Sequence, residues 1–368
     1  MDLGRQHAPL RAELLQAFDR VLGASAFILG EEVELFETAF AEYCEARHCV
    51  GVNSGTAALT ITLLAAGVGP GDEVIVPAHT FIATALAVLH TGATPVCADV
   101  EPGTGLLDPD AAAAAIGPRT AAILPVHLYG QLCAMDELRA LAARHGVALF
   151  EDAAQAHGAS HLGGRAGAFG QAAAFSFYPS KNLGAVGDGG AIVTNDDELA
   201  ARARRLRDLG RLDGSGHQLV GYNERLDGLQ AAALRIKLGH LDSWNAARRV
   251  LAKRYAAQLG DSVELLEERP GSECVYHLFP IRTADRDGLA RQLAADGIAC
   301  GIHYPLALPD QPALPVLRGA CAPVARDWAA RELSLPIFPG LTGVELESVT
   351  HAVAHALDVP PMSVVKRW

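Results

Sequence analysis

The chain has 368 residues, of which half are hydrophobic, so it can bury a large core and form about two domains of ordinary size. Its formal net charge of −12 argues against a surface for nucleic acid or an anionic membrane, since both need a basic face. Its seven cysteines are scattered without a CxxC pair, which predicts reduced thiols, no disulfide framework and no zinc site.

The N-terminal segment lacks the basic and apolar regions of a signal peptide. No apolar run approaches the roughly 20 residues that a membrane-spanning helix needs. We therefore expect a cytoplasmic protein that binds neither a membrane nor a metal.

Short strand-like runs alternate with helical runs between about residues 46 and 200. The expected strands are 48–52, 73–76, 94–98, 121–124, 147–150, 173–177 and 191–194. The Ala-rich segments that separate the first five are 56–67, 80–91, 109–116 and 136–145. This alternation predicts an α/β fold with βαβ units around a mostly parallel sheet. No crossover helix fits between the last two strands, so we expect them not to pair in parallel.

The rest of the chain is expected to add helices and a smaller domain. Helices are expected at 196–209, 227–254 and 287–296, and a strand at 274–279. The long second helix would lead into a compact α+β region. We therefore expect a large domain at 1–245 and a small C-terminal domain at 246–368, with the N-terminal segment able to pack on the small one.

Two hydroxyl residues flank a glycine between the first expected strand, 48–52, and the helix expected after it. Ser54, Gly55 and Thr56 follow this strand and open the helix. Free amides at a helix N-terminus, a glycine that permits close approach and two hydroxyls make a cradle for phosphate. The alternative is an ordinary helix cap by Ser54 or Thr56.

A lysine and a carboxylate follow two neighbouring strands. The apolar run 147–150 ends in Glu151-Asp152, which places a carboxylate at a strand's carboxyl end, where open α/β sheets build their sites. Lys181 stands on a turn after the strand 173–177, and a Gly-Asp-Gly-Gly hinge follows it. Pyridoxal phosphate (PLP) needs such a pair, an amine that forms a Schiff base and an anion for the pyridinium nitrogen. A solvated acid or a helix cap is the alternative for Asp152.

Further residues are expected around this cofactor. Gln155, one helical turn after Asp152, would reach the phenolic oxygen. Phe81 would stack on the ring, or else pack in the core. Ser176 would donate to the phosphate, and Tyr178 would face the substrate. Candidates for the substrate pocket, each with a structural role as the equal alternative, are His127, His157, His303 and Tyr304.

Seven sequence blocks occur in a characteristic order. They are Gly30-Glu-Glu-Val-Glu-Leu-Phe-Glu, Asn53-Ser-Gly-Thr, Gly71-Asp-Glu-Val-Ile-Val-Pro, Pro125-Val-His-Leu-Tyr-Gly, Glu151-Asp-Ala-Ala-Gln-Ala-His-Gly, Phe175-Ser-Phe-Tyr-Pro-Ser-Lys-Asn and Gly221-Tyr-Asn-Glu-Arg-Leu-Asp. On these blocks the chain resembles the sugar aminotransferases of the DegT/DnrJ/EryC1/StrS family. Those proteins are fold-type I PLP enzymes that aminate keto-sugars on nucleotide carriers.

The resemblance assigns roles to residues already noted. It implies that Lys181 forms the Schiff base and that Asp152 holds the pyridine nitrogen. The other cofactor contacts that it implies are Gln155, Phe81, Gly55, Thr56 and Ser176. It also implies that Asn223 comes from the neighbouring subunit to the same phosphate, so that the enzyme is a homodimer with shared sites. Arg225 is carried over as a substrate contact.

The resemblance implies transfer of an amino group, with L-glutamate as the expected donor, to a keto-sugar nucleotide. The block around Lys181 is similar to that of enzymes acting at C3, which favours a dTDP-3-keto-6-deoxyhexose. A 4-keto or UDP-linked sugar, a cyclitol ketone and a non-catalytic PLP-binding regulatory role are the alternatives. Residues 211–217 depart from the family's Lys-Tyr pattern, and this segment is expected to shape the sugar site.

Overall fold

The computed structural model describes residues 2–212, 216–260 and 262–358. Its centre is a seven-stranded sheet with the order β1-β9-β8-β5-β4-β2-β3. The strands are β1 (His48–Val52), β2 (Glu73–Pro77), β3 (Thr94–Ala98), β4 (Thr120–Ile123), β5 (Ala148–Asp152), β8 (Ala172–Ser176) and β9 (Gly190–Thr194). Strands β3, β2, β4, β5 and β8 are parallel, whereas β9 is antiparallel to both β8 and β1. The predicted α/β class and the non-parallel pairing of the last two strands are confirmed.

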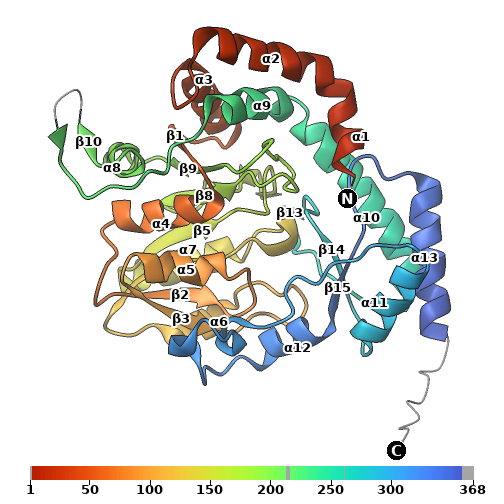
Figure 1. Ribbon diagram of the computed structural model, residues 1–368. Helices are drawn as coiled ribbons and strands as arrows, with labels where there is room; N and C mark the ends of the chain where they lie inside the picture. The colour runs from red at the N-terminus through yellow and green to blue at the C-terminus, as the bar shows by residue number, and fades with distance from the viewer. Residues whose placement is uncertain (1, 213–215, 261, 359–368) are drawn as a thin grey trace, which may run out of the picture.

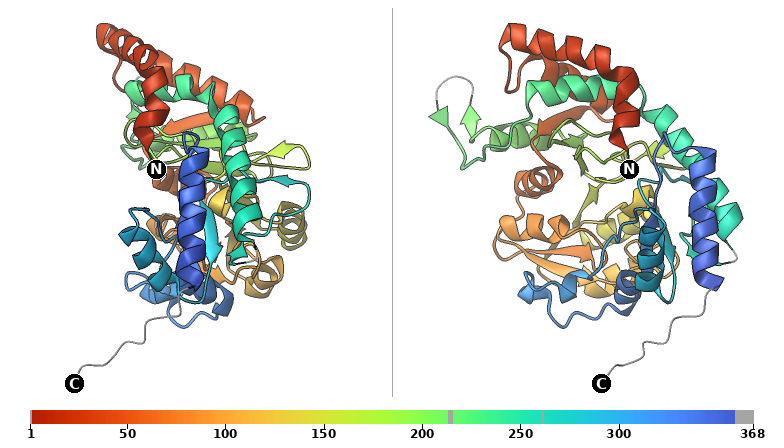
Figure 2. Two further views of the ribbon diagram at one scale, coloured as in Figure 1. Left: turned by 90° about the vertical axis from the view of Figure 1, so that its right-hand side faces the viewer. Right: turned by 45° about the vertical axis from the view of Figure 1, so that its right-hand side comes forward.

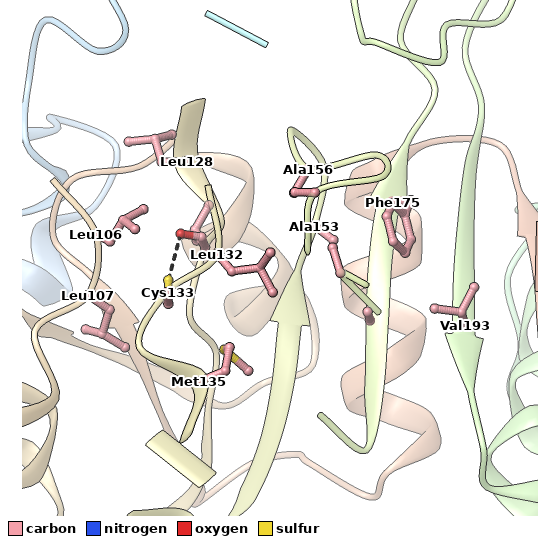
Figure 3. Packing of buried hydrophobic residues seen from close by; sticks show 14 of the residues in the cluster. Leu106, Leu107, Leu128, Leu132, Cys133, Met135, Ala153, Ala156, Phe175 and Val193 are labelled. Atoms are coloured by element: carbon pink, nitrogen blue, oxygen red, sulfur yellow. Dashed lines mark hydrogen bonds between the residues drawn. The ribbon is translucent and has the colours of Figure 1, made fainter. Parts of the chain in front are cut away.

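Helices cover both faces of this sheet (Figure 1). One face carries α4 (Gly55–Ala65), α5 (Ala83–His90) and α8 (Asp197–Arg207). The other carries α3 (Glu31–Tyr43), α6 (Pro109–Ala115), α7 (Met135–His145) and α9 (Gly228–Leu238). Because both faces are buried, the strands are mainly apolar, with polar residues at their ends, and their side chains alternate between two cores. In β8, Ala174 faces one core and Phe175 the other. Figure 3 shows Phe175 with Val193 and Ala153 in the second core.

The C-terminal part has a third core of its own, beside the main sheet (Figure 1). It consists of α10 (Leu241–Leu259), α11 (Arg286–Ala295), α13 (Gly343–Asp358), β12 (Glu264–Leu265), β14 (Phe279–Arg282) and β15 (Glu332–Leu335). The N-terminal α1 (Leu3–His7) lies next to α13 (Figure 2), where Arg5 pairs with Glu345 at 2.7 Å. The domain boundary at residue 245 stays a prediction.

The remaining elements are short connections and peripheral segments. They are η1 (Ala8–Leu10), α2 (Arg11–Ala24), η2 (Leu128–Gly130), β6 (Ser160–His161), β7 (Gly164–Arg165), β10 (Arg211–Leu212), β11 (Gly216–His217), β13 (Ser272–Glu273), η3 (Leu308–Asp310), η4 (Pro315–Leu317) and α12 (Pro323–Arg331). Within the described residues, no helix is both long and apolar enough to cross a membrane.

Two expectations about elements were wrong. The helix expected at 227–254 is divided into α9 and α10 by Gly239 and His240, and glycine is a weak helix former. The strand expected at 274–279 begins only at Phe279. Upstream of it, the amides of Val275 and His277 donate to the carbonyls of Gly130 and Tyr129 at 2.9 Å. The turn η2, and not a neighbouring strand, therefore holds this segment.

Candidate active site

A cavity of about 370 Å³ opens at the carboxyl ends of β1, β5 and β8. The parallel direction of β5 and β8 brings their ends together, and the two antiparallel pairings of β9 bring the end of β1 to the same edge. The sequence-predicted residues that line the cavity are Ser54, Gly55, Thr56, Phe81, Asp152, Gln155, Ser176, Tyr178, Lys181, His303 and Tyr304. Residues from five separate segments thus meet at one place.

Asp152 is the last residue of β5, and its side chain is fixed from two sides. Its Oδ2 accepts a 2.9 Å hydrogen bond from the Thr84 hydroxyl, and its Oδ1 accepts one of 3.2 Å from the amide of Ala154. Burial raises the pKa of Asp152, while these two hydrogen bonds and the charge of Lys181 oppose the rise. The carboxylate is therefore held in a fixed orientation beside the cavity.

Lys181 follows β8 on a turn closed by its own amide, which donates to the carbonyl of Tyr178 at 2.8 Å. Burial lowers the pKa of Lys181 to about 8, because an ammonium group loses its hydration here, and the negative charge of Asp152 opposes the shift. Near neutral pH the uncharged fraction of this amine is therefore larger than that of an ordinary lysine. An uncharged amine is the nucleophilic form that attacks a carbonyl group.

The N-terminus of α4 forms another part of the cavity wall. Ser54 caps this helix, since its hydroxyl accepts from the amide of Ala57 at 3.1 Å. A Cβ added to Gly55 would lie 2.6 Å from the Cβ of Ser176, so only glycine permits β8 to approach α4 this closely. Free amides, the helix dipole and the Ser176 hydroxyl consequently converge on one corner. This combination suits a phosphate group.

Gln155 connects the end of β5 to a loop from the C-terminal part. Its Oε1 accepts from the amide of Tyr129 at 2.7 Å, and its Nε2 donates to the hydroxyl of Tyr304 at 3.1 Å. The Tyr129 hydroxyl in turn donates to the carbonyl of His303 at 2.7 Å. The ring of Tyr304 lies 5.3 Å from that of Phe81. Phe81 is 51% exposed, so one face of its ring is open for stacking.

The fold and this geometry agree with comparisons to known proteins. Residues 9–354 match the model of the family described as the DegT/DnrJ/EryC1/StrS aminotransferase family. The chain belongs to this aminotransferase family. It is 51% identical to a protein of Saccharopolyspora erythraea named erythromycin biosynthesis sensory transduction protein EryC1, over 96% of this chain and 97% of the relative. It is 49% identical to the dTDP-3-amino-3,4,6-trideoxy-alpha-D-glucose transaminase of Streptomyces venezuelae, over 96% of this chain and 94% of the relative.

Solved structures give the same result. DesV of S. venezuelae superposes with a TM-score of 0.95 at 49% identity, covering 98% of both chains. NtdA of Bacillus subtilis, solved with its bound cofactor PMP, superposes with a TM-score of 0.88 at 33% identity, covering 95% of this chain and 82% of that one. The chain is therefore a sugar aminotransferase, and its cofactor is PLP.

The cavity of this aminotransferase fits PLP in its own right. The amine of Lys181 and the carboxylate of Asp152 share the cavity with the phosphate-type corner at Gly55. A Cβ at Gly55 would close that corner. Among the described residues, no cluster of three or more histidine, cysteine or acidic side chains could hold a metal ion.

Some predicted residues do not reach the cavity of the aminotransferase. His157 is fully buried, and its ring lies 5.4 Å from that of Phe175 and 5.8 Å from that of Phe177. Arg225 pairs with Asp208 at 3.0 Å. Asn223, which forms a backbone bridge to the same Asp208, also lies outside the cavity of its own chain. Of the segment 211–217, residues 213–215 lie outside the described residues.

His127 is a structural residue of the aminotransferase. Its Nε2 lies 3.0 Å from Oε2 of Glu151, and both side chains are fully buried. Burial alone would lower the pKa of His127, yet its contacts with Cys133 and Glu151 raise it to about 10. Glu151 also accepts hydrogen bonds from the amides of Gly167 and Gly170. The pair fastens the loop after β7 to β5 and does not face the substrate.

Sequence reasoning missed several residues at the aminotransferase cavity. Thr84 fixes Asp152, and Ser180, Asp188 and His277 line the cavity. Ser180 directly precedes Lys181 in the recognised block and Asp188 lies in the Gly-Asp-Gly-Gly hinge after it, so their proximity to the lysine in the sequence was an available signal. Nothing in the sequence marked His277, because it lies in the segment mistaken for a strand.

Proposed function

We propose that this aminotransferase moves an amino group from L-glutamate to a dTDP-linked 3-keto-6-deoxyhexose in amino-sugar biosynthesis. The name of the relative from Streptomyces venezuelae, which specifies a dTDP-linked 3-amino-6-deoxy sugar, supports this substrate class. The sequence block around Lys181 supports the same position of amination. The observation that carries the proposal is the shared cavity of Lys181, Asp152 and the helix N-terminus at Gly55.

Lys181 and Asp152 would act on protons at two places. When bound, PLP supplies an electron sink for the carbanion at Cα of the amino donor. The Nζ of Lys181 takes the proton from that Cα in its uncharged form and returns a proton when the sugar is aminated. The carboxylate of Asp152 keeps the pyridine nitrogen protonated. The Thr84 hydroxyl holds this carboxylate in place.

The remaining cofactor contacts follow from the geometry of the cavity. The amides of Gly55 and Thr56, with the hydroxyls of Ser54 and Ser176, would hold the phosphate. Gln155 uses one N–H of its amide for Tyr304, and the other is available to the phenolic oxygen of the cofactor.

The proposed sugar contacts differ in their support. Tyr178, His303 and Tyr304 line the cavity, which supports a contact with the sugar. His157 and Arg225 do not line the cavity, so the structure gives no support for a contact between either of them and the sugar.

A second copy of the chain would complete the site by contributing Asn223 to the phosphate. Four apolar side chains around the start of α9, the helix that begins five residues after Asn223, are each more than a third exposed in one chain: Phe27, Ile28, Val186 and Tyr222. Ile28 bridges Asp227, and Val186 donates its amide to Gln230, so the patch surrounds the start of α9. Soluble proteins cover such patches at interfaces, which supports a homodimer with two shared sites. The seven cysteines are free thiols, which supports a cytoplasmic location.

The test is a screen of the purified holoenzyme against 3-keto and 4-keto nucleotide sugars, with glutamate and other amino acids as donors. We expect turnover with glutamate and dTDP-linked 3-keto sugars, and loss of the yellow cofactor band and of turnover in Lys181→Ala. Lys253→Ala, which removes an exposed lysine of α10, is the control. Exclusive use of 4-keto sugars, UDP-sugars or cyclitol ketones would overturn the proposed substrate. A protein that binds PLP without reacting with glutamate would support the regulatory role that the name of the Saccharopolyspora relative indicates.

A further inference from the structure

His277 lines the cavity although it belongs to the C-terminal part of the chain. Its amide donates to the carbonyl of Tyr129, and its side chain is only 5% exposed. Its own carbonyl accepts from Nη1 of the buried Arg248 at 3.3 Å, and the same nitrogen donates to the carbonyl of Tyr276 at 3.1 Å. The backbone N–H and the backbone carbonyl of His277 are therefore both held by hydrogen bonds, which gives its ring a defined position in the cavity wall.

Asn182, the residue after Lys181, determines which ring nitrogen of His277 carries the proton. The Nδ2 of Asn182 donates to the carbonyl of Val275 at 3.0 Å and to Oδ1 of Asn245 at 2.8 Å. A carbonyl oxygen can only accept, so this contact fixes the orientation of the Asn182 amide. Its Oδ1 consequently faces Nδ1 of His277 at 3.1 Å as an acceptor. The proton of His277 must lie on Nδ1.

The other nitrogen of His277 is left as a pure acceptor. Burial lowers the pKa of His277 well below its ordinary value, and the charges of Lys181 and Arg248 act in the same direction. The ring is therefore neutral, with its single proton engaged by Asn182. Nε2 has a lone pair, has no hydrogen-bond partner among the described residues and is not sealed from solvent. This acceptor at the cavity wall is therefore available to a donor group of a bound ligand.

We propose that Nε2 of His277 accepts a hydrogen bond from a hydroxyl group of the sugar substrate, and that Asn182 is the positioning residue that fixes its tautomer. The inference rests on the proposed function, because it takes a keto-sugar nucleotide as the acceptor substrate. A keto oxygen has no proton to donate, so His277 recognises a hydroxyl and not the carbonyl that is aminated. His277 is thus a specificity-determining residue on the wall beside Lys181.

The substitution His277→Asn tests the role of Nε2 separately from that of Nδ1. The Nδ2 of the new asparagine stands where Nδ1 of the histidine was and can still donate to Asn182, whereas the acceptor toward the cavity is lost. We expect about a tenfold rise in KM and in the Kd for the sugar nucleotide, as for the loss of one hydrogen bond. The melting temperature and the glutamate half-reaction, followed by bleaching of the yellow band, should be unchanged. His161→Asn, which alters a histidine outside the cavity, is the control and should match the parent in all four measurements.

The tautomer is tested independently of activity by ¹⁵N nuclear magnetic resonance of the holoenzyme. The His277→Asn spectrum assigns the signals of His277 among the 14 histidines. We expect a protonated Nδ1 and an unprotonated Nε2, and an upfield shift of the Nε2 signal when the dTDP-linked 3-amino-3,6-dideoxyhexose product is added. Asn182→Ala should give a mixture of both tautomers.

The outcomes distinguish this inference from the proposed function. A proton on Nε2, or an unchanged sugar KM and Kd in His277→Asn, would overturn the role of His277 even if the enzyme aminates dTDP-linked 3-keto sugars. An equal loss in the glutamate half-reaction would do the same, because it would indicate a general structural role. If the parent enzyme accepts no keto-sugar nucleotide, the proposed function fails, and the inference fails with it even if the tautomer is as expected.

Discussion

Oγ1 of Thr84 donates a 2.9 Å hydrogen bond to Oδ2 of Asp152, which joins the first turn of α5 to the end of β5. The Thr84 oxygen also lies 3.1 Å from the hydroxyl of Thr80. Because the Thr84 proton is used for Asp152, Thr80 must be the donor in that second bond. The buried Thr84 hydroxyl therefore orients the carboxylate of Asp152, from which it is separated by 68 positions in the sequence, and the Thr80 hydroxyl supports Thr84.

We expect Thr84→Val to reduce activity without abolishing it. Valine has nearly the same shape, but Asp152 loses a donor, which costs about 1–3 kcal/mol for a charged, buried acceptor. The loss should raise the pKa of Asp152 further, since the Thr84 hydrogen bond lowers it. Turnover and thermal stability measure the effect. Thr62→Val is the matched control, because the buried Thr62 hydroxyl has no partner within the described residues. Equal effects of the two changes would contradict a role for Thr84 at the site.

Asp152→Asn should retain the fold and bind PLP, yet react on the order of 100-fold more slowly. Asparagine has a single acceptor oxygen, so it can keep only one of the hydrogen bonds from Thr84 and Ala154, and as a neutral group it does not stabilise a protonated ring nitrogen. Single-turnover kinetics with glutamate measure the rate, and Asp136→Asn on the exposed face of α7 is the control. A rate equal to that of the parent would mean that Asp152 is only a helix cap, since asparagine caps equally well.

The attachment of PLP to the apoenzyme should accelerate with pH and level off above about pH 8. Lys181 reacts as the uncharged amine, and burial lowers its pKa from 10.5 to about 8. Below that pH the ammonium form dominates, so the rate falls as the solution becomes more acidic. Stopped-flow absorbance across pH 6 to 10 follows the reaction. A rate that still rises steeply at pH 10 would indicate a lysine with an ordinary pKa.

Gly55→Ala should weaken PLP binding and lower stability by about 1–3 kcal/mol, as is typical of overpacking. The new methyl group would lie 2.6 Å from the Cβ of Ser176, which forces α4 and β8 apart at the phosphate corner. Urea unfolding and PLP titration measure the two effects. Gly23→Ala is the control, because a Cβ there meets nothing within 4 Å. Normal PLP affinity in Gly55→Ala would argue that the phosphate binds elsewhere.

Mixing two inactive variants should restore activity if the site is shared between subunits. A hybrid dimer of Lys181→Ala with Asn223→Ala has one intact site and one doubly damaged site. With random exchange and a fully inactive second variant, an equal mixture should recover about a quarter of the parent activity. Native mass spectrometry would establish that the subunits exchange. Exchange without recovery would place Asn223 in its own subunit's site, or outside any site.

Most of the α/β framework could be predicted from the sequence because its signals are local. Apolar runs separated by Ala-rich segments indicated all seven strands of the main sheet. The meeting of Lys181 and Asp152 also followed, since the carboxyl ends of neighbouring parallel strands lie at one edge of a sheet. Glycine and hydroxyl residues at a strand-to-helix junction predicted the corner at Gly55 for the same local reason.

Only the tertiary structure decided which other side chains face the cavity. His157 and His303 are equally plausible in sequence, yet one packs against Phe175 and the other lines the cavity. Thr84 and His277 reach the site through contacts with residues 68 and 95 positions away. The segment before β14 has the composition of a strand, but its amides pair with η2. Local patterns determine most of the elements, whereas long-range packing determines which residues meet and which strand-like segments pair, and no local pattern encodes that choice.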